Sequence, residues 1–562
     1  MPASRPARRH DLDALRAVAM LLGIALHASL AYVPGISWPV HDVRPAPWLG
    51  LVAIGIHGFR MPLFFLLSGY FTALLWRSRG CAAMLRQRFL RVFVPLILAS
   101  LTLAPIFTGL ARRGLAVPAD EMAGLRQEAS HLVEALRSRD EAAVAKAIAA
   151  GDDVTRLDPE FGMPPVTLAA LVGDPILVGL LLDAGADPQA RGRDGRTPLH
   201  AAAFAGRLPV VELLLDRGAA PAPRSPKGDT PLDSARVDLS TTAFIAGLVR
   251  IGLDEPAALT RSREAIIERL GRRAGAAVPP SSAPPAAGRL ARARDGYRAW
   301  LLSPRWSVRW LPAAEPRSLV LGKAFNYLWF LWFLCWLAVG FACIATLATR
   351  LRLPPLPRWL VTSPAALLWT IPATLPAQFF MGLFKPTFGP DTSASLLPQP
   401  HVLCYYAVFF AYGAVYECAD DRENRVGRRW PLALVAALLL FLPAGLATMA
   451  HPARTALPQL LYAWSMCWAA IGFFRWLVPA ENRTWRYLSD ASYWCYLAHL
   501  PLLVLLQQAS RGWPLPGGLK FLLVCLAASG LLLASYQLLV RHTPVGLLLN
   551  GPRASRAAPP TA

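Results

Sequence analysis

Blocks of about twenty consecutive apolar residues recur along this chain, and they constrain its fold more than any other feature. A block of that length crosses the hydrocarbon core of a bilayer as a single helix. Charged residues make up 16% of the chain, well below the roughly 25% of soluble domains, so the blocks indicate membrane spans. Ten candidate spans lie near residues 13–33, 50–75, 92–110, 319–348, 360–383, 401–418, 430–449, 456–478, 490–509 and 517–540. The expected fold class is therefore all-α, a polytopic membrane helix bundle of about ten spans.

Positive charge is distributed unevenly between the two sides of this predicted bundle. If the N-terminus is cytoplasmic, the short cytoplasmic segments contain 22 Lys and Arg residues, whereas the opposite short loops contain four. Such a bias predicts cytoplasmic termini in a bacterial inner (cell) membrane protein. The formal net charge of +22 then reflects orientation and contact with membrane lipid. Nucleic acid is not an expected partner.

A polar, arginine-rich stretch interrupts the apolar blocks after the third candidate span. Glycines recur in it at a spacing of 33 residues, at Gly162, Gly195 and Gly228. Thirty-three residues is the ankyrin period, and the unit beginning at Gly195 resembles the ankyrin consensus closely. The predicted repeats lie near 162–194, 195–227 and 228–255, after a degenerate cap at 143–153. The expected fold thus includes an inserted α-solenoid, in which His200 belongs to a repeat turn as a structural hydrogen-bonding residue.

These observations divide the chain into four predicted segments. Residues 1–111 form the first part of the membrane domain with three spans, and residues 112–271 form the inserted ankyrin-repeat domain. Residues 272–316 form a Pro/Ala/Ser-rich linker and an interfacial segment, and residues 317–562 complete the membrane domain with spans four to ten. The charge bias places the insertion in the periplasm, since long domains translocate largely regardless of their charge. Ankyrin arrays bind partners, so a protein partner is possible there.

Ionisable residues inside the first candidate span are the first indication of chemistry. Arg16 and His27 are separated by ten residues, so they lie about 16 Å apart near one helix face. Arg16 lies near the cytoplasmic surface and His27 in the outer half. Taken singly, Arg16 could be a topology anchor and His27 a packed, hydrogen-bonded histidine, but ionisable groups within spans are costly and usually functional.

The motif combination resembles acyltransferase family 3, whose members transfer acyl groups from coenzyme A to cell-surface glycans and related acceptors. The Arg-x10-His span carries the resemblance together with His57-Gly-Phe-Arg60-Met-Pro-Leu-Phe-Phe-Leu-Leu-Ser68-Gly69 in the second span. Further matching segments are Arg86–Arg91, Leu328–Leu331, Tyr487–His499 and Arg541–Gly551. The last of these is similar to the glucan-biosynthesis protein C branch, whose named members succinylate periplasmic glucans. Where that branch commonly has a histidine before Leu-Trp-Phe-Leu, this chain has Asn326 and Tyr327.

The resemblance implies a membrane O-acyltransferase that uses acyl-coenzyme A as donor and a glycan or similar hydroxyl as acceptor, with an acyl group of the acetyl or succinyl class. Neutral imidazole suits the base that a hydroxyl needs to attack a thioester, so His27 is the predicted base. Arg16 is the predicted donor-binding residue, because guanidinium binds phosphate well. Arg60 is predicted to stabilise the oxyanion or orient the acceptor. His57 and His499 complete the predicted site.

No metal is expected, since the eight cysteines show no metal-ligand spacing and imply no disulfide framework. Two other functions fit the sequence less well. A polytopic transporter or flippase would also bury Arg and His, but it predicts internal repeats or broken half-helices in corresponding positions, and neither is found. A membrane-anchored ankyrin docking protein would not need the ionisable residues of the spans.

Overall fold

The computed structural model separates into two compact units, one formed by residues 1–116 with 289–562 and the other by residues 117–288. The described residues are 9–33, 36, 38–115, 131–158, 162–225, 228–237, 242, 252–273, 289–308, 317–384, 387–421, 423–449 and 451–551. The first unit is the membrane bundle and the second is the ankyrin insertion. Each is all-helical apart from one short strand pair, which confirms the predicted fold class among the described residues.

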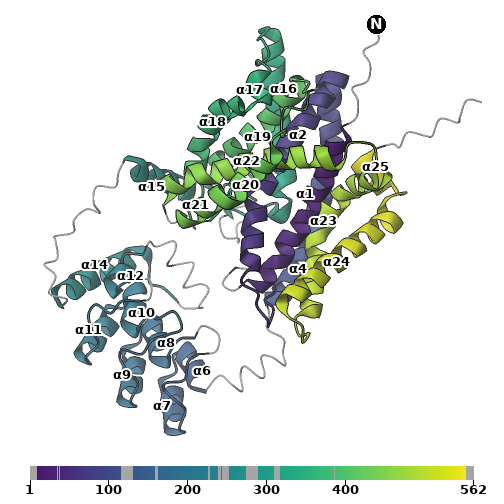
Figure 1. Cartoon of the computed structure of the whole chain (residues 1–562). Coiled ribbons are helices and arrows are strands. Elements are labelled where there is room, and N and C mark those ends of the chain that lie inside the picture. Colours follow the sequence, from purple (N-terminus) through teal and green to yellow (C-terminus); the bar gives the residue numbers. More distant parts are fainter. Residues whose placement is uncertain are drawn as a thin grey trace, which may run out of the picture. The chain divides into compact units, whose positions relative to one another are not determined.

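The membrane unit consists of helices that run side by side (Figure 1). Its helices are α1 His10–Ser29, α2 Leu49–Arg88, α3 Val94–Leu101, α4 Leu103–Leu115, α15 Arg289–Leu302, α16 Trp329–Arg350, α17 Trp359–Thr362, α18 Leu367–Phe379, α19 Pro400–Cys418, α20 Trp430–Ala436, α21 Leu442–Ala447, α22 Pro452–Leu477, α23 Arg483–Ser510, α24 Gly517–Ser535 and α25 Pro544–Asn550. Six helical segments among the described residues are long and apolar enough to cross a membrane, so this is a multi-pass membrane protein. The predicted number of ten spans is not confirmed.

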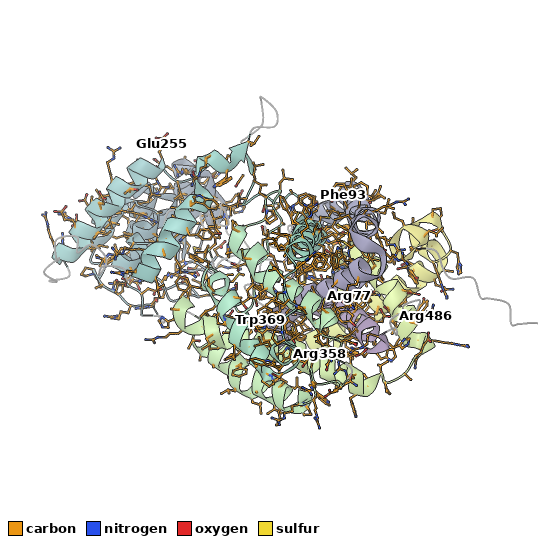
Figure 2. The ribbon with its side chains drawn as sticks, turned by 90° about the horizontal axis from the view of Figure 1, so that it is seen from above. Arg77, Phe93, Glu255, Arg358, Trp369 and Arg486 are labelled. Atoms are coloured by element: carbon orange, nitrogen blue, oxygen red, sulfur yellow. The ribbon has the colours of Figure 1, made fainter. Side chains whose placement is uncertain are left out.

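One of the six segments, Leu49–Leu101, is 53 residues long and reverses direction within its length. Gly80 has φ 80° and ψ 174°, a conformation that residues with a side chain rarely adopt. The chain turns back there. The turn brings Arg88 to Thr72, and the Arg88 guanidinium donates to the Thr72 hydroxyl at 2.6 Å. A π-helical turn at Phe89–Phe93 continues into α3. This segment therefore contains the predicted span 50–75 and the first part, residues 92–101, of the predicted span 92–110. Before the turn lies Arg77, which is labelled in Figure 2. It is paired with Glu417 on α19 at 3.1 Å.

Glycines allow α2 and α19 to approach each other very closely. A Cβ atom added to Gly69 would lie 1.9 Å from the Phe410 carbonyl oxygen, and one added to Gly413 would lie 1.8 Å from the Leu66 carbonyl oxygen. Small residues let membrane helices pack backbone to backbone in this way. Helix α1 packs on α2, α22, α23 and α24, so it lies inside the bundle.

The chain returns to the membrane unit with α15, which is bonded to the loop that follows α18. The Arg294 guanidinium donates to the carbonyls of Phe379, Met381 and Gly382 at the end of α18. Strands β1 Ser307–Val308 and β2 Arg317–Ser318 pair antiparallel. Segment 317–325 then pairs with segment 387–399 through backbone bonds from Phe325 N to Ala394 O and from Leu397 N to Leu319 O, each 2.9 Å. These two segments form a rim over one end of the bundle.

The second unit is a stack of helix pairs (Figure 1). Its described helices are α6 His131–Ser138, α7 Glu141–Ala149, α8 Pro165–Val172, α9 Pro175–Asp183, α10 Pro198–Phe204, α11 Leu208–Asp216, α12 Pro231–Ala235 and α14 Pro256–Arg273. Bonds between neighbouring repeats recur at a spacing of 33 residues, for example from Arg191 to the Arg224 carbonyl and from Arg196 to Asp229. The predicted period is thus also the period of the structure.

Both ends of the repeat stack differ from the prediction in detail. The segment predicted as a degenerate cap at 143–153 belongs to a complete helix pair, α6 and α7, which packs on α8 and α9. At the other end α14 packs on α10, α11 and α12. Most of the predicted third repeat after residue 237, and residues 274–288 and 309–316 of the predicted linker and interfacial segment, lie outside the described residues.

The structural role predicted for His200 is confirmed. Its ring bonds to Thr197 through Nδ1, closing a capping box at the start of α10, and to the Asp229 carbonyl through Nε2 at 3.1 Å. The side chain is fully buried between two repeats. Burial lowers the pKa of His200 below its ordinary value of 6.5, because desolvation disfavours the charged imidazolium.

Candidate active site

Two cavities of about 390 Å³ each lie end to end along α1. We call the cavity at the N-terminal end of α1, lined by Arg16, the inner cavity, and the one lined by His27 the outer cavity. Met20, Phe64 and Phe330 line both cavities, so these three apolar side chains form the junction between them. The structure therefore places Arg16 in one cavity and brings His27, His57, Arg60 and His499 together in the other.

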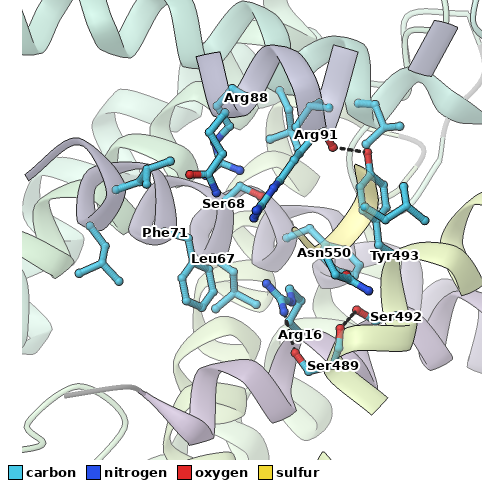
Figure 3. Close-up of a pocket in the computed structure, with 18 of the residues that line it drawn as sticks. Arg16, Leu67, Ser68, Phe71, Arg88, Arg91, Ser489, Ser492, Tyr493 and Asn550 are labelled. Carbon is cyan, nitrogen blue, oxygen red and sulfur yellow. Dashed lines mark hydrogen bonds between the residues drawn. The ribbon is translucent and has the colours of Figure 1, made fainter. Parts of the chain in front are cut away.

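Among the described residues, the charged side chains that line the inner cavity are all arginines. They are Arg16, Arg79, Arg88 and Arg91, and no Asp or Glu is among the described lining residues. Figure 3 shows Arg16, Arg88 and Arg91 converging from different parts of the bundle on one space beside Ser489 and Asn550. Only Arg16 was predicted as a ligand-binding residue. The basic segment Arg86–Arg91 was recognised as a motif, but the turn at Gly80 that folds it over α1 is not evident from the sequence.

Polar contacts hold the arginine side chains of the inner cavity in place, but they do not neutralise all of the positive charge. The Arg16 guanidinium donates to the Ser489 hydroxyl at 2.6 Å and lies 3.5 Å from the Asp13 carboxylate. Arg91 lies against Gly551, where a Cβ atom would clash with its guanidinium. Within the described part of the chain, the buried Nε atoms of Arg16 and Arg88 have no hydrogen-bond partner. The cavity thus presents unused N–H donors and excess positive charge, which suits a ligand carrying several phosphates.

The outer cavity holds the predicted chemical groups. The His27 and His499 rings lie with centroids 5.4 Å apart, although the residues belong to α1 and α23. His57 comes from α2, and its ring lies against Gly389 on the rim, where an added Cβ atom would be 2.9 Å from His57 Cδ2. Aromatic side chains form much of the remaining wall, namely Trp38, Phe107, Tyr327, Trp329 and Tyr496. Flat aromatic faces beside a few polar groups are typical of a site that binds and orients a small organic ligand.

Hydrogen bonding settles the tautomer of one histidine of this pair. His499 Nδ1 lies 2.7 Å from the Tyr496 carbonyl oxygen, and a carbonyl can only accept, so Nδ1 carries the proton. The neutral ring therefore keeps its lone pair on Nε2. His27 is held differently, because its ring stacks on Trp38 with centroids 5.6 Å apart and an interplanar angle of 11°. Among the described residues its buried Nδ1 has no hydrogen-bond partner.

Arg60 reaches across from α2 to the helix that carries His27. A Cβ atom added to Gly23 would lie 2.2 Å from Arg60 Nη1, so the guanidinium occupies the space that the missing side chain leaves, one turn before His27. The described residues place no carboxylate within ion-pairing distance of Arg60, and its buried Nε has no partner among them. A guanidinium in this position can stabilise negative charge that develops next to His27.

The position where the sequence departs from the related branch also lies in the outer cavity. Asn326 lines it with φ 46°, a left-handed conformation that Asn tolerates better than most residues. The Tyr327 hydroxyl donates to the Leu497 carbonyl at 3.0 Å. That carbonyl has no α-helical partner because Pro501 lacks an N–H. Tyr327 therefore ties the turn before α16 to the part of α23 that precedes Pro501.

Among the described residues, no group of three His, Cys, Asp or Glu side chains could hold a metal ion. All eight cysteines are free thiols. The polar side chains that line the two cavities carry imidazole, guanidinium, ammonium, hydroxyl and amide groups.

Comparison with known families matches both units of the chain. A family model described as an acyltransferase domain matches residues 9–116 and 290–539. A second model, described as ankyrin repeats in three copies, matches residues 132–235. The first match is split by the second, so the ankyrin repeats are inserted in the middle of the acyltransferase domain. It contains both cavities' predicted residues, from Arg16 to His499.

Curated relatives match a shorter stretch. Proteins named glucans biosynthesis protein C from Salmonella paratyphi B, Salmonella heidelberg and Salmonella schwarzengrund are each 42% identical to this chain over 98 residues. The aligned stretch is 17% of this chain and 25% of each relative. This chain thus spans about a quarter of the length of the curated relatives it matches.

Proposed function

Because the chain belongs to the family of the acyltransferase domain that its membrane unit matches, we propose that it is a membrane-bound O-acyltransferase. It moves an acyl group of the acetyl or succinyl class from acyl-coenzyme A to a hydroxyl of a periplasmic or cell-surface glycan or similar acceptor. The observation that carries this proposal is the pair of cavities on α1, one lined by arginines and the other by histidines, which meet at an apolar junction. The name of the matched relatives supports a glucan as the acceptor class.

The inner cavity suits the donor. Coenzyme A carries several phosphates at one end and its acyl thioester at the end of a long flexible arm. The arginines of the inner cavity, Arg16, Arg79, Arg88 and Arg91, offer planar donor forks that bind phosphate oxygens in pairs. With the phosphates held there, the arm extends along α1 past the junction at Met20 and brings the thioester into the outer cavity, towards His27. His27 lies two helical turns further along the same helix.

The outer cavity suits the acceptor and the chemistry. His27, as the neutral imidazole, takes the proton of the acceptor hydroxyl while its oxygen attacks the thioester carbonyl carbon. Arg60 stabilises the negative charge that forms on the carbonyl oxygen. When the tetrahedral intermediate collapses, the carbon–sulfur bond breaks, and the imidazolium returns its proton to the departing coenzyme A thiolate. The products are an ester of the acceptor and free coenzyme A.

His57 and His499 have supporting roles in this mechanism. Nε2 of His499 faces the site as an acceptor, because Nδ1 is committed to Tyr496, so it can hold a hydroxyl of the acceptor or the His27 ring in position. His57 packs against Gly389 of the rim and orients the acceptor from the side of α2. The aromatic wall provides faces on which a sugar ring stacks.

The test of this function is replacement of the predicted base in the full-length protein. His27→Ala should lower acyl transfer by about 10²–10⁴-fold, the usual cost of losing a general base, while binding of acyl-coenzyme A is kept. Transfer of radiolabelled acyl groups to a glucan is measured in detergent, together with donor affinity. His451→Ala is the matched control, since His451 is exposed outside both cavities. A His27→Ala enzyme with near-normal turnover would exclude the mechanism.

We also propose the orientation that this function needs. Both termini and the inner cavity face the cytoplasm of a bacterial inner membrane, and the ankyrin insertion faces the periplasm, where it binds a protein partner. Every lysine of the chain then lies on the periplasmic side, at Lys146, Lys227, Lys323, Lys385 and Lys520. A membrane-impermeant amine crosslinker added to spheroplasts should therefore react with the protein and join its insertion to the partner. Labelling only after lysis would show the opposite orientation.

A further inference from the structure

The side chain of Gln507 on α23 lies at the centre of a small buried network beside the active site. It is 2% exposed. Its amide nitrogen donates to the carbonyls of His27 at 3.2 Å and Ala28 at 3.1 Å. Its amide oxygen accepts from the indole N–H of Trp38 at 2.9 Å. One amide thus contacts both the backbone of His27 and the ring that stacks on the His27 imidazole.

The carbonyls that Gln507 binds belong to the last turn of α1, which ends at Ser29. Carbonyls in the last turn of a helix have no partner within the helix and need one from elsewhere. In a membrane bundle without bulk water this need is stronger than at a protein surface. Gln507 supplies that partner and so fixes the end of α1, and with it the backbone of His27, against α23.

The chain segment that carries Trp38 has an anchor of its own. It lies in the segment between α1 and α2, which a buried ion pair anchors to α24: Lys520 Nζ lies 2.7 Å from Asp42 Oδ1, with side chains 0% and 3% exposed. Lys520 also donates to the Arg511 carbonyl. The indole therefore has a fixed place, and its face is set parallel to the His27 ring.

Gln507 also shares a helix face with the other histidine of the site. His499 and Gln507 are eight residues apart on α23, so they lie two turns apart on one side of that helix. One helix, α23, thus carries both His499 and the amide that locates His27. The distance between the two imidazoles depends on this shared helix more than on any direct bond between the rings.

We infer that Gln507 is a positioning residue that sets the place and ring orientation of His27, acting through the α1 carbonyls and through Trp38. This inference rests on the proposed function for its effect on rate, because His27 is the base in that proposal. A displacement of about 1 Å in a catalytic group can cost up to about 10²-fold in rate. Gln507→Leu should therefore lower kcat by about 10–10²-fold and leave the KM for acyl-coenzyme A close to its original value.

The experiment compares Gln507→Leu with Gln508→Leu in the full-length protein. Gln508 is the matched control because it is the same residue type one position on, and its amide donates to the Leu110 carbonyl of α4 instead of α1. The direct readout is the rate at which diethylpyrocarbonate modifies His27, measured by peptide mass spectrometry. Gln507→Leu should speed this reaction, since the ring is freed from its stack, and Gln508→Leu should leave it unchanged.

Trp38→Phe tests the same positioning role if Gln507→Leu does not fold. Phenylalanine keeps a stacking face but removes the N–H that Gln507 accepts, so it should also raise His27 modification. In the double variant the two losses of kcat should be less than additive, because both changes break one linkage.

The outcomes separate the inference from the function on which it rests. Faster His27 modification in Gln507→Leu, combined with normal acyl transfer by His27→Ala, would retain the positioning role and reject His27 as the base. Unchanged His27 modification in folded Gln507→Leu, or a fully additive double variant, would overturn the positioning role itself.

Discussion

Replacing Gly23 with alanine tests the placement of Arg60 by a change of a single methyl group. The new Cβ atom would lie 2.2 Å from Arg60 Nη1 and 3.4 Å from Cζ. An ordinary contact needs at least 3.4 Å, so the nearest guanidinium nitrogen must withdraw by at least about 1.2 Å. Because only the end of a flexible side chain is in the way, the helices themselves need not move. The perturbation therefore acts on the active site and leaves the fold intact.

Activity and stability should change in opposite directions. Losing or misplacing one oxyanion donor typically costs about 10²–10³-fold in kcat, which corresponds to roughly 2.7–4 kcal/mol of transition-state stabilisation. Within a helix, alanine is more favourable than glycine by about 0.5–1 kcal/mol. We expect Gly23→Ala to lose about 10²-fold in acyl transfer while its resistance to thermal unfolding in detergent is equal to or slightly above that of the original protein.

The assay measures acyl transfer and thermal unfolding side by side, with Gly530→Ala as control. Gly530 lies in α24, and a Cβ atom there would have no neighbour within 4 Å, so this change should affect neither the active site nor the rate. In an Arg60→Ala background, Gly23→Ala should cause little further loss, since the group it displaces is gone. A folded Gly23→Ala enzyme with normal turnover, or full additivity with Arg60→Ala, would refute this account of Arg60.

Two further predictions address the donor site and the insertion. Arg16→Ala and Arg88→Ala should each weaken binding of acyl-coenzyme A by about 10–10²-fold, because each removes charge-assisted bonds worth roughly 1.5–3 kcal/mol, whereas the exposed control Arg358→Ala should not change the affinity measured by calorimetry. The ankyrin unit should lose stability as the pH falls below 6.5. Burial lowers the pKa of His200 in the folded state, so the unfolded chain binds the proton more readily than the folded one. The contribution of His200 to stability is therefore complete only above that pH. Hydrogen exchange of α10 and α12 in the full-length protein should show this dependence, and a folded His200→Asn variant with the same pH profile would contradict it.

The large features of this molecule could be predicted from local sequence signals. Apolar length indicates membrane spans wherever a helix faces lipid or a neighbouring helix, and the 33-residue period identifies the repeats because each repeat packs on the next. The sequence of segment 143–153 predicts only a degenerate cap, although the structure has a full helix pair there, and the difference has a physical reason. Its helix pair, α6 and α7, packs against one neighbouring repeat, so fewer of its positions are constrained to the consensus.

The arrangement of the active site could be predicted only in part. The motifs single out Arg16 and His27, which lie at a helical spacing on one span. They did not show that His499 on α23 meets His27, or that Trp38 stacks on it, because periodicity defines the face of a helix and not its neighbour. The turn at Gly80 adds Arg88 and Arg91 to the inner cavity for the same reason, since its effect depends on where the returning helix packs.

The apolar junction between the two cavities has an electrical consequence. Suppose that the inner cavity opens to the cytoplasm, as proposed, and the outer cavity to the periplasm. Water and ions then fill both cavities, and only the layer formed by Met20, Phe64 and Phe330 separates them. The membrane voltage then falls mostly across this thin insulating layer, where moving one charge through 100 mV is worth roughly 2.3 kcal/mol. A neutral acyl group passes it without electrical work. An acyl group that carries a carboxylate moves a negative charge across this layer, so its transfer rate depends on the membrane potential. The inside-negative potential of the cell then favours its movement outward.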